Sequence, residues 1–168
     1  MAYVSYEYYT NLYEKPEIDQ KTFERVLWNA EKKLDMHTSG VDGVRKLKIA
    51  FPVVEEDAEA VKRCVIELVE LMHKIETAER NAEMSRGYVE REDGSLHGKV
   101  ISSLSAGNET INFATGNNVA MTLMDNLVLN KSAQERLFEF TINEYLSGVL
   151  DANGVNLLYM GRYPYGVR

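Results

Sequence analysis

The chain has 168 residues, of which 45% are hydrophobic and 27% are charged, and its formal net charge is −7. These values are typical of a folded globular protein and fit one domain with a modest core. No apolar run approaches the roughly 20 residues of a membrane-spanning helix, and no secretion signal is recognisable. Acidic residues outnumber basic ones by 26 to 19, and the basic ones are scattered, so the sequence does not indicate a protein that grips nucleic acid.

Two amphipathic helices are predicted near the start of the chain. The first begins after a Ser5 cap, ends at Pro16 and carries tyrosines on one side: Tyr6, Tyr9 and Tyr13. The second runs from an Asp19 cap to about Thr38, where a glycine-containing turn stops it. Its expected buried stripe consists of Phe23, Val26, Leu27, Ala30 and Leu34.

Two further helices complete the expected core. The longest runs from about Glu55 to Ala82, and its apolar residues follow a heptad spacing: Ala58, Val61, Val65, Leu68, Met72 and Ile75. The last helix is expected from a capping box at Ser132–Glu135 to about Leu150. Its predicted buried residues are Leu137, Phe138, Thr141, Tyr145 and Val149. The expected fold class is therefore mainly α, a small bundle of about four helices.

Residues 83–129 differ from the helical regions, and we interpret them as an extended β-hairpin arm. Asp93-Gly94 favours a hairpin turn, and Lys99–Ala114 alternates apolar with small or polar residues, which predicts a pair of short strands. Two isolated strands leave unpaired backbone groups that a strand of another copy can satisfy. The expected subunit contacts are Val100, Leu104, Ile111 and Phe113. The alternative is that the hairpin lies flat on its own monomer.

Residues 151–168 are unusually apolar and aromatic for a chain end, and we interpret them as an extended docking tail. Aromatic residues and arginine are enriched at the energetic centres of protein interfaces. The residues expected to dock on a partner are Leu157, Leu158, Tyr159, Arg162 and Tyr163. The alternative is that the tail packs into a groove of its own domain. With the arm and the tail, residues 1–168 are expected to form a single domain.

Residues that could carry chemistry are few. Glu70 and His73 lie three positions apart on the longest predicted helix, with Glu76 one turn further. This spacing occurs in di-iron sites, but those sites need the motif on two helices. His73 is expected at the edge of the buried stripe, in water, and Cys64 is expected as a buried thiol. We therefore predict no catalytic residue, metal or cofactor. The alternative is a small helical metal-binding or redox protein that uses Glu70, His73 and Glu76.

Several segments, taken in chain order, carry a resemblance to one family. VSYEYYTNLY is similar to a Tyr-rich first helix, and FERVLWNAEKKLDMHTSG to a second helix that ends in an Ile/Leu-Asp-x-x-Thr signature. VKRCVIELVELMHK is similar to a long central helix, and KVISSLSAGNETINFA to a Ser-rich strand followed by an alternating strand. EYLSGVLDANGVNLLYMGRY is similar to a closing Tyr-Leu and Gly-Leu-Leu-Tyr-x-Gly pattern. Together they resemble the head–tail connector, or adaptor, proteins of tailed bacteriophages and prophages.

The resemblance has two departures. Residues 83–98 and 119–129 are longer than the usual connections, and Asn153-Gly154-Val155 interrupts the closing motif. The resemblance implies a helical structural subunit, without enzymatic activity, of a dodecameric ring at the head–tail junction of a virion, made in the bacterial cytoplasm. It implies other copies, the portal protein and a neck, stopper or tail-completion protein as partners. DNA would pass through the channel without sequence-specific binding. A regulatory or host-interaction module is a further alternative.

Overall fold

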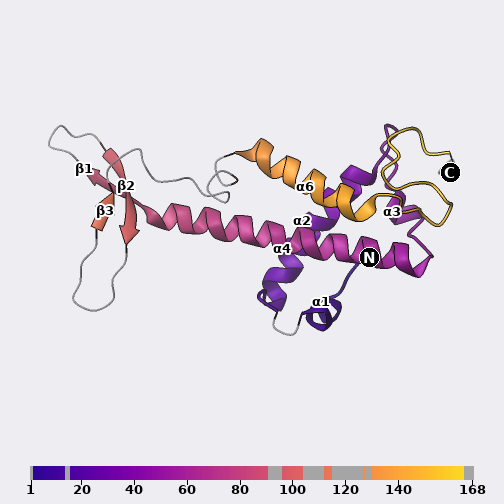
Figure 1. Ribbon diagram of the computed structural model, residues 1–168, viewed down its shortest axis with the longest axis horizontal. Helices are drawn as coiled ribbons and strands as arrows, with labels where there is room; N and C mark the ends of the chain where they lie inside the picture. Colours follow the sequence, from indigo (N-terminus) through magenta and orange to yellow (C-terminus); the bar gives the residue numbers. More distant parts are fainter. Residues whose placement is uncertain are drawn as a thin grey trace. The chain divides into compact units, whose positions relative to one another are not determined.

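Figure 1 shows the computed structural model of the chain. The structure describes residues 2–13, 16–90, 96–103, 112–114, 127 and 130–164. Most of these residues are helical, which confirms the expectation of a mainly α protein. None of the described helices is long and apolar enough to cross a membrane. The chain divides into two compact units, one formed by Met1–His73 with Ser132–Arg168 and the other by Lys74–Lys131.

The first two helices begin where their caps predict. Helix α1 spans Tyr6–Leu12, and the Ser5 hydroxyl accepts the N–H of Tyr8. Helix α2 spans Gln20–Thr38, and the Asp19 carboxylate accepts two N–H groups of its first turn. All members of the predicted stripe of α2 are buried, and two polar residues that the stripe did not include are buried with them, Asp35 and Thr38.

Helices α3 and α4 follow. Helix α3, Lys46–Ile49, is a single turn that the sequence did not predict, and its Lys46 is completely buried. Helix α4, Glu55–Ser85, is the predicted long helix and extends three residues beyond Ala82. Within its predicted stripe the buried members are Val61, Val65, Leu68 and Ile75. Ala58 and Met72 are only half-buried, which corrects the expectation for them.

Helix α6 spans Lys131–Leu146. It ends four residues before the predicted Leu150, because Gly148 has a φ of +84° and turns the chain out of the helix. Of its predicted buried residues, Phe138, Thr141 and Val149 are buried. Leu137 and Tyr145 are half-buried, and Ile142 and Leu146 take their place in the core.

Side chains join the helices of the first unit. The Tyr9 hydroxyl donates to Oε1 of Glu70 at 2.5 Å and the Tyr8 hydroxyl donates to Oε1 of Glu59 at 2.7 Å, so α1 is bonded to α4. Lys33 on α2 pairs with Glu135 on α6 at 2.6 Å. The ring of Phe23 stacks on Tyr9 with centroids 5.0 Å apart, which packs α2 against α1.

The second unit contains a three-stranded antiparallel sheet in the order β1-β2-β3. The strands are β1 (Arg86–Glu90), β2 (Leu96–Ser103) and β3 (Asn112–Ala114). Strand β1, which the sequence analysis did not predict, pairs Arg86 with Val100. Strand β3 pairs Phe113 with Ile101. An arm that extends to other copies of the chain stays a prediction.

Candidate functional site

The C-terminal segment, residues 147–164, is the part of the predicted docking tail that the structure describes in detail, together with the turn that leads into it. It first makes a narrow loop, in which Leu150 and Asn156 form an antiparallel bridge. The Asp151 carboxylate closes this loop, because its Oδ1 accepts the N–H groups of Asn153 and Val155, each at 2.8 Å. The sequence Asp-Ala-Asn-Gly therefore forms the turn of this loop, whereas α6 has already ended at Leu146.

Lys46 of α3 fixes the next residues of the segment. Its ammonium group donates to the main-chain oxygens of Asn156 at 3.3 Å, Leu157 at 2.8 Å and Tyr159. Burial lowers the pKa of Lys46, and the negative charges of Asp151 and Asp42 oppose this shift. A buried ammonium needs a full set of acceptors, and here main-chain carbonyl groups supply them.

Tyr163 fixes the far end of the segment. Its main-chain N–H donates to Oδ2 of Asp42 at 2.8 Å, and this bond lowers the pKa of Asp42. Its hydroxyl donates to Oδ2 of Asp151 at 2.6 Å and accepts from the Asn153 side chain at 2.8 Å. The aromatic ring is buried, so the segment closes back on its own loop.

The five residues predicted to dock on a partner divide into two groups. Leu157 and Tyr163 are buried in their own chain, which corrects the expectation that they contact a partner. The physical reason is that Lys46 of α3 and Asp42 of the loop before it bond to the segment and hold it against its own domain. Leu158 is half-buried, whereas Tyr159 and Arg162 are exposed.

Two further exposed apolar residues lie near Tyr159 and Arg162: Met160, which belongs to the predicted tail, and Val41, which the sequence did not indicate. Met160 is the next residue in the segment, and its main-chain oxygen accepts the N–H of Val41 at 3.0 Å. Val41 is 81% exposed and Met160 is 56% exposed. Together Val41, Tyr159, Met160 and Arg162 form what we call the tail surface. The sequence feature that could have indicated Val41 is its position as an apolar residue within the turn sequence Ser-Gly-Val-Asp-Gly, where an apolar side chain is expected to be exposed.

The predicted arm contacts are located only in part. Val100 lies in β2 and Phe113 in β3, on paired strands. Leu104 and Ile111 lie outside the described residues. Their role as subunit contacts stays a prediction.

The residues of the alternative metal site make other interactions. Glu70 is buried and accepts the Tyr9 hydroxyl. His73 is half-buried rather than at the edge in water, and its Nδ1 is buried without a hydrogen-bond partner. Cys64 is buried, and burial raises its pKa to about 12. Among the residues that the structure describes, no three His, Cys, Asp or Glu side chains gather to hold a metal ion.

The chain matches no protein-family model, no curated protein and no solved structure. The resemblance to phage connector proteins is therefore carried by the ordered motifs of the sequence. The ring, the portal contact and the location in a virion remain expectations of that resemblance.

Proposed function

We propose that this protein is a structural subunit of a bacteriophage head–tail connector ring, which joins the portal to the tail and surrounds the DNA channel. In this role it carries out no reaction and resides in the virion after synthesis in the bacterial cytoplasm. Its partners are other copies of the chain, the portal protein and a neck, stopper or tail-completion protein. The net charge of −7 suits a channel wall that lets DNA pass without holding it.

The observation that carries this proposal is the tail surface. Tyr159, Met160 and Arg162 stand on a segment that Lys46 bonds to α3 and Tyr163 bonds to Asp42, and the main chain of Val41 is bonded to that of Met160. A surface that is already ordered loses little conformational entropy when it binds. Tyrosine, methionine and arginine are also the residue types that protein interfaces favour. The tail surface is therefore suited to a permanent protein partner such as the portal.

The buried part of the C-terminal segment makes a deletion an unsuitable test of docking. Deletion of residues 155–168 would remove the buried side chains of Leu157 and Tyr163 and the carbonyl acceptors of Lys46, so loss of assembly could reflect misfolding. Substitution of exposed residues avoids this difficulty. We expect Val41→Asp and Met160→Asp each to weaken binding of the full chain to the portal protein of the same genome by about tenfold or more.

The control is Phe140→Asp, because Phe140 is 65% exposed on α6 and is not part of the tail surface. We expect this variant to bind the portal protein like the unmodified chain, and circular dichroism should show equal helix content in all three variants. Wild-type portal binding by both Val41→Asp and Met160→Asp would reject the tail surface as the docking site.

Ring formation is a separate test. Phe113→Asp should reduce the fraction of ring-shaped particles in negative-stain images while the helix content is unchanged, if β3 contributes to contacts between copies. A purified chain that forms no ring alone or with the portal protein would contradict the proposed function. Metal analysis of the same purified protein separates it from the metal-binding alternative, which predicts a stoichiometric metal that Glu70→Gln or His73→Ala removes.

A further inference from the structure

The segment Ala2–Ser5, here called the strap, lies before α1 and has no regular secondary structure. Tyr3 anchors it. The main-chain N–H of Tyr3 donates to Oε1 of Glu31 at 2.5 Å, and its hydroxyl donates to Oδ1 of Asp35 at 2.5 Å. The ring stacks on Phe51 with centroids 5.7 Å apart, and the next residue, Val4, is buried. The strap is thus bound like a short peptide.

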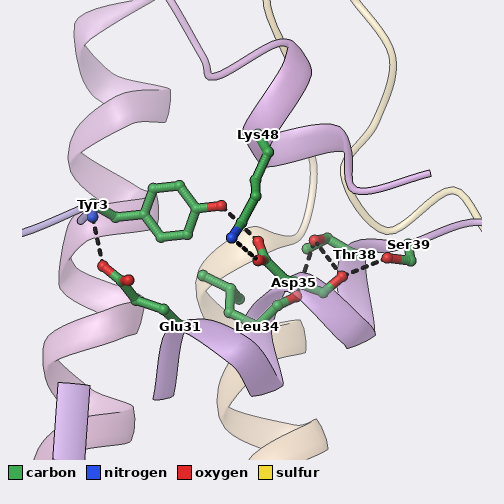
Figure 2. Close-up of polar contacts among 7 residues, drawn as sticks. All are labelled: Tyr3, Glu31, Leu34, Asp35, Thr38, Ser39 and Lys48. Carbon is green, nitrogen blue, oxygen red and sulfur yellow. Dashed lines mark hydrogen bonds and ion pairs between the residues drawn. The ribbon is translucent and has the colours of Figure 1, made fainter. Parts of the chain in front are cut away.

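The site that receives Tyr3 is built around a buried carboxylate. Figure 2 shows Tyr3 and Lys48 converging on Asp35 from the strap and from α3. The Lys48 ammonium lies 3.2 Å from Oδ2 of Asp35, and only 3% of Asp35 is exposed. A buried carboxylate that lost the phenol would keep a single charged partner at the solvent edge, which is unfavourable. The Tyr3 hydroxyl therefore stabilises this carboxylate, and burial together with the bond to Asp35 raises the pKa of Tyr3, which keeps the hydroxyl protonated.

The site does not depend on the peptide bond that joins the strap to α1. Glu31 and Asp35 belong to α2 and lie 28 and 32 residues from Tyr3. Lys48 belongs to α3, and Phe51 follows it. Because α2 and the α3 region supply these contacts, an identical strap from another molecule could make the same contacts.

Two hollows flank the strap. One, of about 420 Å³, is lined by Ala2, Tyr3, Leu47, Lys48 and Phe51. The other, of about 610 Å³, lies between the strap and the first two helices, with Val4, Tyr6, Phe23 and Leu27 among its lining residues. The strap therefore lies in a trough with open space on both sides. Its departure would expose apolar walls, and the segment that the structure shows to fit this trough is the strap sequence itself.

We propose that this trough binds the strap of a second copy of the chain, so that neighbouring copies can exchange their Tyr3 segments. Within one molecule the strap has a high effective concentration, on the order of millimolar, and dilute protein keeps its own strap. In an oligomer the strap of an adjacent copy is held at a similar effective concentration, so it competes for the trough on equal terms with the molecule's own strap. A four-residue strap reaches about 14 Å, which limits exchange to adjacent copies. The proposal goes beyond the proposed function, because it needs a second copy and no phage component.

Two full-chain variants test the exchange. Tyr3→Ala keeps the receiving site but lacks the anchor, and Asp35→Ala keeps the anchor but lacks its acceptor. Neither variant can form the Tyr3–Asp35 bond alone, whereas in a mixture the Tyr3 of one can bind the Asp35 of the other. We expect native mass spectrometry at tens of micromolar to detect a mixed dimer that neither variant forms alone. A mixture that contains only the species of its separate components would overturn the proposal.

A second measurement does not depend on the folding of Asp35→Ala. A fluorescent peptide with the sequence AYVSYE, residues 2–7, is added to the Tyr3→Ala chain, and binding is followed by anisotropy. A matched peptide carries Tyr3→Phe, which retains the ring and removes the hydroxyl. We expect the tyrosine peptide to bind at least about tenfold more tightly, because its phenol donates to a charged acceptor. No binding, or equal binding of both peptides by a chain whose circular dichroism is unchanged, would overturn the proposal.

Discussion

The ammonium group of Lys46 lies 2.8 Å from the main-chain oxygen of Leu157, and both residues are completely buried. This bond joins a one-turn helix to a segment 111 residues later in the chain. Three exposed residues of the tail surface, Tyr159, Met160 and Arg162, follow within five residues of Leu157, so their position depends on this buried contact. Loss of this bond should therefore both destabilise the fold and displace the candidate docking residues.

The first prediction concerns Lys46→Met, which keeps most of the side-chain volume and removes the ammonium group. Three main-chain oxygens would lose a donor, and a buried acceptor without a partner costs about 1–3 kcal/mol. We expect the free energy of unfolding to fall by about 2–4 kcal/mol in urea titrations. Lys21→Met on the exposed side of α2 is the control, with an expected change below about 0.5 kcal/mol. Equal effects of the two substitutions would show that the Lys46 bonds contribute little.

The second prediction compares two tyrosines of α1. The Tyr9 hydroxyl donates to Glu70 in the core, and the Tyr8 hydroxyl donates to Glu59 near the surface. Tyr9→Phe should lower the free energy of unfolding by about 1–3 kcal/mol, because it removes a hydrogen bond to a buried charge. Tyr8→Phe should cost less than about 1 kcal/mol, because water can replace the lost hydroxyl as a donor to the Glu59 carboxylate. Thermal and urea unfolding of both variants measure the difference, and a larger cost for Tyr8→Phe would contradict the assignment.

The third prediction is a loss of stability at alkaline pH. Burial raises the pKa of Cys64 from 9.0 to about 12, and burial with the Glu59 bond raises that of Tyr8 from 10.0 to about 12. Between the ordinary pKa and the raised pKa of each group, the unfolded chain has lost a proton that the folded chain still holds. The stability contributed by these groups is therefore complete below pH 9 and falls as the pH rises toward 12. Lys46 acts in the opposite direction, because its pKa is lowered.

Cys64→Ala tests the share of the thiol in this pH dependence. The variant should be less stable than the unmodified chain at pH 7, because a buried atom is lost, but its stability should fall less steeply between pH 9 and pH 12. The measurement is the urea midpoint at a series of pH values. Identical slopes for the two proteins would mean that the Cys64 thiol does not contribute to the alkaline loss.

The features predicted correctly from the sequence depend on local interactions. Ser5 and Asp19 cap α1 and α2 through groups two or three residues away, and the stripe of α2 follows from helical spacing alone. The end of α6 was predicted too late, because the apolar residues continue past Leu146 while Gly148 reverses the chain. Local patterns thus predicted the presence of these helices correctly, but they did not predict where α6 ends.

The candidate site was harder to predict, because its contacts span the chain. A lysine in the sequence Arg-Lys-Leu-Lys reads as solvated, and nothing near Lys46 indicates that it binds carbonyl groups beyond residue 155. For the same reason the composition of the tail could not separate the buried Leu157 from the exposed Met160. Asp35 reads as a polar helix residue until Tyr3 and Lys48 are seen to meet it.

The last prediction concerns the contact between two glycines that holds the tail surface in place. A Cβ atom at Gly40 would lie 2.3 Å from the main-chain oxygen of Gly161, which is closer than real Cβ contacts allow. Gly40→Ala should therefore displace the backbone around Met160 and Gly161 and speed amide hydrogen exchange there, whereas α1 and α4 keep their protection. Gly43→Ala is the matched control, because Gly43 has a φ of +71° but open space around it. It should cost about 1–2 kcal/mol without altering exchange in the C-terminal segment. Equal exchange in the two variants would show that the close approach of Gly40 to Gly161 does not hold the tail surface.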